Sequence, residues 1–398
     1  MKNFAKSFMC VAMAASFVTA FSGCNTDSES SATVPQTTDS TAATTELATT
    51  MPATADQVPT SPVINYNALK QDADMVAAKF DSALVANKFK GTVYYKIGND
   101  FEYIGNNGYA DKGTHTYNSL NTNYYVGSLT KQFTAAAIML LQEQDKLSTD
   151  DTLDKYYPDY KYGSQINVRN LLTMTTGLPD YLGKTNESIR ANSPQYDISE
   201  ENSAEENHAV ILDWILSQEL DESEDDEYCY SNSDYFLLGD IIEKVSGKSY
   251  EDFIRENIFE PLQMTSSSFE PTEQLATGYQ DIFDDEWNIY PGVAYSSQGL
   301  ISNLGDLLKW TEAITGDQFL TTESREEMFT PYKSNFAYGL YVDEYGNYYN
   351  DANFYRFNAR ILFAQDLNVA FIAFSNYTQS DPRKICEKLD EILKPYVK

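Results

Sequence analysis

The sequence predicts an α+β fold, an α/β sandwich in which an antiparallel sheet from both chain ends is flanked by terminal helices and carries a mostly helical inserted subdomain. Two observations predict the sheet: strand-like runs occur at 91–104 and again at 338–374, and the sequence between them is mostly helical or irregular. The flanking helices follow from apolar residues at helical spacing outside these runs. We therefore expect one folded body over residues 63–398.

Residues 1–24 have the pattern of an export signal. Lys2 and Lys6 precede an apolar core that is too short to span a bilayer as a mature helix. The core ends in Phe21-Ser22-Gly23-Cys24, which is similar to a bacterial lipobox. We expect Cys24 to become the lipid-modified first residue of the mature protein; the alternative is a plain signal peptide cut at small residues.

Residues 25–62 predict a disordered linker. They are dominated by Thr, Ser and Ala, with four Pro, five acidic residues and neither Lys nor Arg, and such a composition cannot build a core. The linker would hold the folded body outside the membrane of a bacterial cell, with the lipid anchor as its membrane contact.

The composition restricts partners and cofactors. A net charge of −31 argues against nucleic acid and anionic membrane surfaces as partners. Four Cys without paired spacing and only two His support neither a disulfide framework nor a zinc site, and two His also disfavour a Ser-His-Asp hydrolase. We expect no metal, no cofactor and a monomer.

The folded body should begin and end with elements of the sheet layer. A first helix carries apolar residues at helical spacing: Leu69, Val76, Phe80 and Leu84. The expected strands are Gly91–Ile97, Phe101–Ile104, Tyr338–Val342, Arg360–Phe363 and Val369–Phe374. Asp381-Pro382 then opens a last helix.

A central buried helix is predicted at Thr134–Leu141, a run of strong helix formers that is apolar on nearly every face. Ser128 should lie in its first turn. Residues three apart on a helix are neighbours, so Lys131 would place its amine near the Ser128 hydroxyl, close to the N–H groups of the helix N-terminus. Ser-x-x-Lys alone is a weak pattern, because a Ser N-cap and a solvated Lys produce it by chance.

A second motif, Tyr230-x-Asn232, lies downstream and is followed by a helix over 234–247. A phenol and an amide beside an amine could transfer protons and hold the amine in place. The alternative makes Tyr230 a packed aromatic and Asn232 a helix cap. Its occurrence together with Ser128-x-x-Lys131 favours the functional interpretation.

These motifs together resemble the serine β-lactamase and penicillin-binding-protein superfamily, within it the branch of class C β-lactamases, D-Ala-D-Ala carboxypeptidases and family VIII esterases. Further segments follow in the order of that branch: Leu171 to Pro179, Pro261-Leu262-Gln263-Met264 and Gln298-Gly299-Leu300-Ile301-Ser302. The resemblance implies a β-lactamase/transpeptidase-like fold over most of the folded body.

The resemblance also implies an acyl-enzyme mechanism. Ser128 would attack an ester or amide carbonyl, Lys131 and Tyr230 would share proton transfer, and Asn232 would hold Lys131 and bind substrate. Lys131 can act as a base only where burial or nearby charge keeps its amine partly neutral. Tyr230, held near a cationic Lys131, could carry negative charge more easily than in water.

The third motif of the family, Lys/His-Ser/Thr-Gly on an inner strand, is absent. The equivalent place is Asn350-Asp351-Ala352-Asn353, which has no cation and no glycine. We expect Asn350, Asp351 and Asn353 to line the substrate site, with Asp351 repelling carboxylates and Ala352 adding a methyl where substrate approaches. The backbone N–H groups of Ser128 and Asn353 could still form an oxyanion hole.

An acidic run at residues 221–227 precedes the second motif. It is most simply a solvated loop. A sharper hypothesis is that the run and Asp351 give the cleft a negative rim that favours neutral or cationic substrates. A calcium site here, or at Asp281, Asp284, Asp285 and Glu286, has no support from EF-hand-like spacing.

We therefore expect a lipid-anchored, extracytoplasmic serine hydrolase that cleaves an ester or amide in a small molecule or peptide, in an esterase-like or cell-wall-peptide-modifying role. One alternative is a member of the same fold that has lost turnover and serves as a surface binding or structural protein, because Asn350-Asp351-Ala352 replaces the third motif. A carbohydrate- or peptide-binding module rich in Tyr is a second alternative, which leaves the order of the motifs unexplained.

Overall fold

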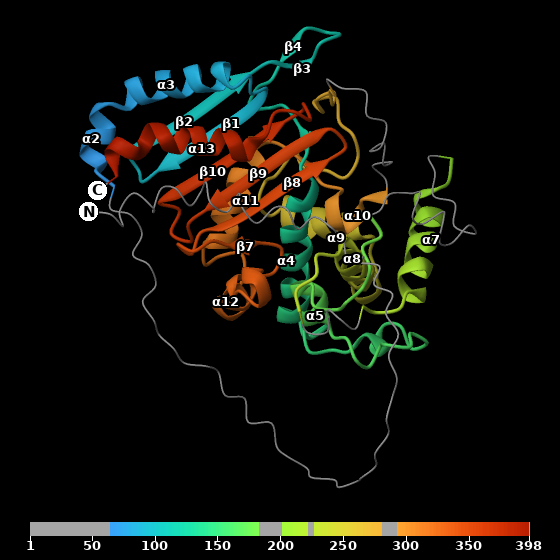
Figure 1. Cartoon of the computed structure of the whole chain (residues 1–398). Coiled ribbons are helices and arrows are strands. Elements are labelled where there is room, and N and C mark those ends of the chain that lie inside the picture. Colours follow the sequence, from blue (N-terminus) through green and yellow to red (C-terminus); the bar gives the residue numbers. More distant parts are fainter. Residues whose placement is uncertain (1–63, 183–200, 222–226, 281–292, 398) are drawn as a thin grey trace, which may run out of the picture.

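The computed structural model describes residues 64–182, 201–221, 227–280 and 293–397 (Figure 1). Several expectations fall outside this part of the chain: the signal segment with Cys24, the linker over 25–62, most of the acidic run at 221–227, and the acidic residues of 281–286. Within the described ranges, no helix is both long and apolar enough to cross a bilayer.

A six-stranded antiparallel sheet forms the centre of the fold, in the order β2-β1-β10-β9-β8-β7. As predicted, the two chain ends share this sheet, because β1 pairs with β10. The strands are β1 (Gly91–Ile97), β2 (Phe101–Asn107), β7 (Tyr341–Val342), β8 (Tyr348–Phe354), β9 (Phe357–Phe363) and β10 (Val369–Ser375). Two small sheets pair β3 (Tyr109–Asp111) with β4 (Thr116–Tyr117), and β5 (Tyr124–Tyr125) with β6 (Ile301–Ser302).

Two strand boundaries differ from the prediction at turns with positive φ. The strand expected from Tyr338 begins only at Tyr341, because Gly339 turns the chain with φ +78°. β9 begins at Phe357, before the predicted Arg360. The hairpin that joins it to β8 turns at Tyr355 and Arg356, both with positive φ, as in tight two-residue hairpin turns.

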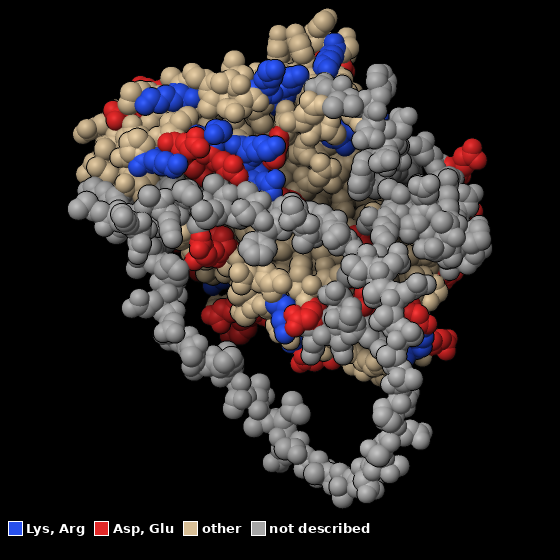
Figure 2. Space-filling view, viewed as in Figure 1, with Lys and Arg blue, Asp and Glu red and all other residues tan. Residues whose placement is uncertain are grey.

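One face of the sheet is covered by helices from the two chain ends, α2 (Tyr66–Gln71), α3 (Ala73–Ala86) and α13 (Pro382–Leu393) (Figure 1). On α3, Phe80 is fully buried, and its ring packs edge-on against Tyr95 at 5.7 Å and Tyr103 at 5.0 Å between centroids. Asp381 caps α13, as its sequence predicts, by accepting a hydrogen bond from the N–H of Arg383. Basic and acidic side chains are interspersed on the outer surface of this layer (Figure 2).

The first and last described residues lie side by side. Ile64 forms a β-bridge with Val397, and the Asn65 N–H donates to the Tyr396 carbonyl at 2.7 Å. The segment before α2 is therefore hydrogen-bonded to the segment after α13 at one end of the helix layer.

The opposite face of the sheet packs against a helical body (Figure 1). Its centre is α4 (Thr130–Glu143), which is buried on nearly every face, as predicted. The other helical elements are η4 (Leu153–Lys155), α5 (Val168–Thr173), α7 (Ala204–Ser217), α8 (Asn232–Ser246), α9 (Tyr250–Ile254), η6 (Arg255–Phe259), α10 (Tyr295–Gln298), α11 (Leu304–Thr315), α12 (Thr322–Phe329) and η9 (Lys333–Asn335). A final turn, η10 (Lys394–Tyr396), follows α13 in the other layer.

Candidate active site

Ser128 lies in a 3₁₀ turn, η3 (Gly127–Leu129), that runs directly into α4. We expected it in the first α-helical turn, and the structure places it just before that turn. Gly127 has φ +52°, and a Cβ there would lie 3.0 Å from the Cβ of Ala352 and 3.1 Å from that of Phe354. The turn with Ser128 therefore packs directly against β8, and any side chain larger than that of glycine at position 127 would come too close to the strand.

Three of the predicted side chains meet at the hydroxyl of Ser128. Its Oγ lies 2.7 Å from the hydroxyl of Tyr230 and accepts a hydrogen bond from Lys131 Nζ at 3.2 Å. Ser128 and Lys131 come from neighbouring turns, whereas Tyr230 comes from the segment before α8. Both neighbours of the hydroxyl can thus exchange protons with it.

Lys131 is fully buried, and its amine is surrounded by oxygen atoms. Besides Ser128, it donates to Asn232 Oδ1 at 2.7 Å and to the Ser297 carbonyl at 3.0 Å. Burial lowers the pKa of Lys131 to about 7, against the opposing effect of the Asp180 and Asp234 carboxyl groups. A large fraction of Lys131 is therefore neutral near neutral pH, as a general base requires.

Tyr230 remains a neutral phenol in the resting site. Burial raises its pKa well above the usual range, and the hydrogen bond with Ser128 opposes this shift only partly. Lys131 Nζ lies over the Tyr230 ring, 4.9 Å from its centroid, and the phenol oxygen points to Ser128. The expectation that a cationic Lys131 eases ionisation of Tyr230 stays a prediction.

Asn232 begins α8, and its side chain lies between Lys131 and Asp180. Its Oδ1 accepts from Lys131 and from Gln298 Nε2, the latter at 3.1 Å. Its Nδ2 donates to both carboxylate oxygens of Asp180, at 3.1 and 3.0 Å. The roles of Asp180 and Gln298 were not predicted from the sequence. The available signal was their position: Asp180 directly follows one of the segments that resemble the family, and Gln298 begins another.

Asn350 is the residue of the replaced third motif that reaches the catalytic turn. It is buried on β8, and its Nδ2 donates to the carbonyls of Ser128 at 3.3 Å and Gly339 at 2.9 Å. Ala352 follows on the same face of the strand, where its methyl packs against Gly127. Asn350 thus links β8 to both neighbouring backbones through its amide.

Asp351 and Asn353 point to the opposite face of β8. Asp351 lies opposite Arg360 on β9, and both its oxygens accept from Arg360 Nη1 at 2.6 Å. Asn353 donates to Asn358 Oδ1. The structure therefore does not bring these two side chains to Ser128. It gives no support to a cleft rim made negative by Asp351, because alternation along the strand directs that carboxylate to a buried guanidinium.

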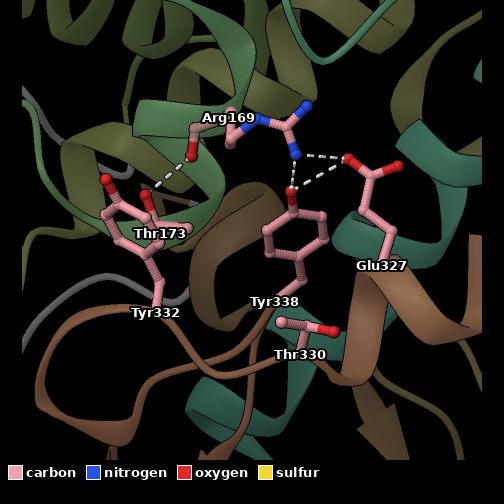
Figure 3. Close-up of a pocket in the computed structure, with 6 residues that line it drawn as sticks. All are labelled: Arg169, Thr173, Glu327, Thr330, Tyr332 and Tyr338. Atoms are coloured by element: carbon pink, nitrogen blue, oxygen red, sulfur yellow. Dashed lines mark hydrogen bonds and ion pairs between the residues drawn. The ribbon is translucent and has the colours of Figure 1, made fainter. Parts of the chain in front are cut away.

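A hydrogen-bonded network joins Tyr338, the residue before Gly339, to α5 and α12 (Figure 3). Arg169 on α5 donates to Glu327 on α12 at 2.6 Å and to the Tyr338 hydroxyl at 2.9 Å. These side chains line a pocket of about 190 Å³ together with Thr173, Thr330 and Tyr332. A Cβ on Gly339 would lie 2.8 Å from the Lys131 carbonyl, so the turn that follows Tyr338 packs closely against α4.

One group of potential metal ligands occurs in the described part of the chain, away from Ser128. The ligand atoms of His208, Asp240 and Glu243 lie within 4.8 Å of one another. Asp240 already accepts from Tyr157 and pairs with Lys244 and His208. The Lys244 ammonium on the Asp240 carboxylate would compete with a metal ion. We therefore interpret these residues as a hydrogen-bonded cluster that stabilises the fold.

The chain is similar to known proteins in sequence and in fold. The sequence model of the Beta-lactamase family matches residues 74–391. The chain is 30% identical over 277 residues to penicillin-binding protein 4* of Bacillus subtilis, a match that covers 64% of this chain and spans 59% of that relative's length.

Solved structures share the fold. D-amino acid amidase from Ochrobactrum anthropi SV3, complexed with D-phenylalanine, superposes with a TM-score of 0.68 at 20% identity, over 81% of this chain and 99% of the amidase. A penicillin-binding protein from Bacillus halodurans gives 0.66 at 21% identity, over 78% and 99% of the two chains. At these identities the likeness is one of fold.

Proposed function

Because this chain belongs to the beta-lactamase family, we propose that it is a serine hydrolase that forms an acyl-enzyme on Ser128. The observation that carries the proposal is the meeting of three groups: the Ser128 hydroxyl lies 2.7 Å from the Tyr230 hydroxyl and 3.2 Å from a lysine amine. A pKa of about 7 for Lys131 supports its role as the base.

The proposed reaction begins with a neutral Lys131. Its amine accepts the Ser128 proton as Oγ bonds to the carbonyl carbon of the substrate, which gives a tetrahedral intermediate. Backbone N–H groups of Ser128 and Asn353 would bind the oxyanion. The bond to the leaving group then breaks, and Tyr230 passes a proton to that group and regains one from the Lys131 ammonium. Water hydrolyses the acyl-enzyme by the same path in reverse.

The proposed substrate is an ester or amide in a small molecule or peptide, in an esterase-like or cell-wall-peptide-modifying role. On the cleft side of β8 the chain offers Asn350 and Ala352, so a substrate carboxylate gains no cation from this strand. Because Asp351 is paired with Arg360, its charge adds little repulsion. We therefore expect anionic lactams to bind weakly for want of attraction.

The location is part of the proposal. A lipidated Cys24 and the linker over 25–62 would place the hydrolase outside the bacterial membrane as a monomer. Metabolic labelling with a fatty-acid analogue should disappear in Cys24→Ala; labelling that persists in this variant would contradict the anchor.

The test of activity uses two covalent probes on purified protein. A fluorophosphonate should label the wild type and leave Ser128→Ala unlabelled, and a penicillin probe should label far more slowly. The absence of Ser128-dependent labelling by either probe, in protein whose circular dichroism shows it folded, would contradict the proposal. That result would favour the alternative, a family member without turnover that acts in surface binding.

A further inference from the structure

Asp180 is a carboxylate held entirely by N–H donors at the start of α8. It accepts from the backbone N–H groups of Leu182 at 2.9 Å and Asn232 at 3.2 Å, in addition to the Asn232 side-chain amide. These four hydrogen bonds favour the carboxylate over the protonated acid, whereas burial opposes them and raises the pKa of Asp180. A negative group at a helix N-terminus is also favoured by the helix dipole.

The contacts of Asn232 permit one orientation of its amide. Its NH₂ faces the two Asp180 oxygens, and its oxygen faces two donors, Lys131 Nζ and Gln298 Nε2. Turned by 180°, the amide would set NH₂ against the lysine amine and its oxygen against a carboxylate. Asp180 thus decides which end of Asn232 meets Lys131.

We propose that Asp180 is a positioning residue of this site: it orients Asn232 toward Lys131, and its carboxylate is the counter-charge of the Lys131 ammonium. The inference rests on the proposed function of Ser128 and Lys131. It extends that function by one residue that lies beyond the three groups meeting at the hydroxyl.

A second buried acid offers a matched control. Asp234 lies on α8 and accepts from Thr176 at 2.6 Å through one oxygen, and its other oxygen is buried with no partner among the described residues. Burial raises the pKa of Asp234 well above its usual range. In the described part of the chain, Asp234 forms no hydrogen bond with Lys131 or Asn232, so Asp234→Asn should leave the orientation of Asn232 unchanged. Because Asp234 also favours the Lys131 ammonium, this variant removes charge near the amine without removing the orientation of Asn232.

The experiment compares wild type, Asp180→Asn and Asp234→Asn by two readouts. The first is an NMR titration of protein labelled with [¹³Cε]lysine, with the Lys131 signal assigned through Lys131→Arg. The second is the rate of fluorophosphonate labelling against pH. Without the Asp180 charge the ammonium is less stable, so the Lys131 midpoint and the acid limb of labelling should both fall by about one pH unit.

Loss of the Asn232 orientation should also lower the plateau labelling rate of Asp180→Asn roughly tenfold. Asp234→Asn should keep the wild-type plateau rate, because Asn232 stays oriented toward Lys131. An Asp180→Asn protein that keeps both the wild-type midpoint and the plateau rate would overturn the inference. Should Asp180→Asn not fold, Asp180→Glu tests the same point, because it retains the charge but displaces the carboxylate. Its Lys131 midpoint should stay at the wild-type value and its plateau labelling rate should fall. An unchanged plateau rate in Asp180→Glu would contradict the inference.

The two proposals fail differently. A wild type that is unlabelled at every pH would overturn the proposed function, whereas the NMR midpoints would still report whether Asp180 acts on Lys131.

Discussion

In the proposed function Lys131 determines the pH at which Ser128 can react, because the proposed base is an amine with no exposed surface. An ammonium in water keeps its proton to high pH, whereas burial brings the pKa of this one to about 7. The oxygens around it still stabilise the charged form, so both forms are present near neutral pH. In the proposed function, the neutral form of this amine takes the place that a histidine base has in other serine hydrolases.

The first prediction concerns the pH dependence of Ser128 labelling. Only neutral Lys131 can accept the Ser128 proton, so the labelling rate should rise about tenfold per pH unit below pH 7 and level off above it. Lys131→Arg, which stays charged, should abolish labelling at every pH. A rate that is flat from acid to neutral pH would exclude Lys131 as the base.

A second prediction separates two roles for Asp351. Its carboxylate pairs with Arg360, which is fully buried, whereas the Asp351 side chain keeps 32% of its surface exposed. Asp351→Asn should lower the free energy of unfolding by about 2–3 kcal/mol, somewhat less than for a fully buried pair. Urea unfolding measures this loss.

The affinity for a penicillin probe should be unchanged in Asp351→Asn, because the side chain lies on the far face of β8. Tighter penicillin binding in this variant would instead indicate that Asp351 faces the cleft. Asn353→Ala serves as the control, since Asn353 is exposed on the same face and carries no charge.

At the scale of elements, the site is the junction of a turn, a helix start and a strand. η3 supplies Ser128, α4 supplies Lys131, and β8 packs against η3 through Ala352 and Asn350. The replaced third motif therefore packs against the turn that carries Ser128, with an amide in place of a cation.

The third prediction tests the packing of η3 on β8. Gly127→Ala should slow labelling of Ser128 by about 10–100-fold, because the new methyl collides with Ala352 and Phe354 and displaces the nucleophile. Gly247→Ala is a matched control: its φ of +71° carries a similar backbone strain, but nothing lies within 4 Å of the added Cβ. Both variants should lose about 1 kcal/mol of stability from the left-handed backbone.

Adding Ala352→Gly to Gly127→Ala removes one of the two collisions and should restore part of the labelling rate. No recovery, together with equal slowing in Gly247→Ala, would show that backbone strain alone accounts for the loss.

At the scale of the whole molecule, the helical body is held by a sheet whose strands come from both chain ends. β1 lies beside β10, and α3 and α13 cover the sheet on the face opposite Ser128. A second buried core thus lies on the sheet face opposite Ser128, apart from the core around the site. The back layer can be weakened without touching any group that meets substrate.

The fourth prediction uses Phe80, which is central in the back layer. Phe80→Ala should lower the free energy of unfolding by about 3–5 kcal/mol, since it leaves a cavity among Tyr95, Phe101 and Tyr103. Met75→Ala on the same helix, where the side chain is 45% exposed, should change it by less than about 0.5 kcal/mol. Labelling of the folded fraction should be equal in both, and a lower rate in Phe80→Ala would contradict this separation of faces.

The sequence predicted the sheet and the two outer helices well, because apolar periodicity and turn residues are local signals. It also predicted that Ser128, Lys131, Tyr230 and Asn232 belong together, through several motifs in one order. Asp180 was not predicted, since a single acidic residue after Leu178-Pro179 forms no periodic pattern and no motif of known spacing. Its meaning comes from α8, which brings Asn232 to it across a long stretch of chain.

The sequence by itself determined the family, the composition of the layers and the identity of the groups at the nucleophile, because these depend on residue types and their order. Only the tertiary structure decided which way the β8 side chains face and how the buried groups titrate. Asp351 and Asn350 are neighbours in sequence, yet one meets Arg360 and the other the Ser128 carbonyl. Strand alternation directs neighbours to opposite faces, and pKa depends on burial and on partners from distant segments.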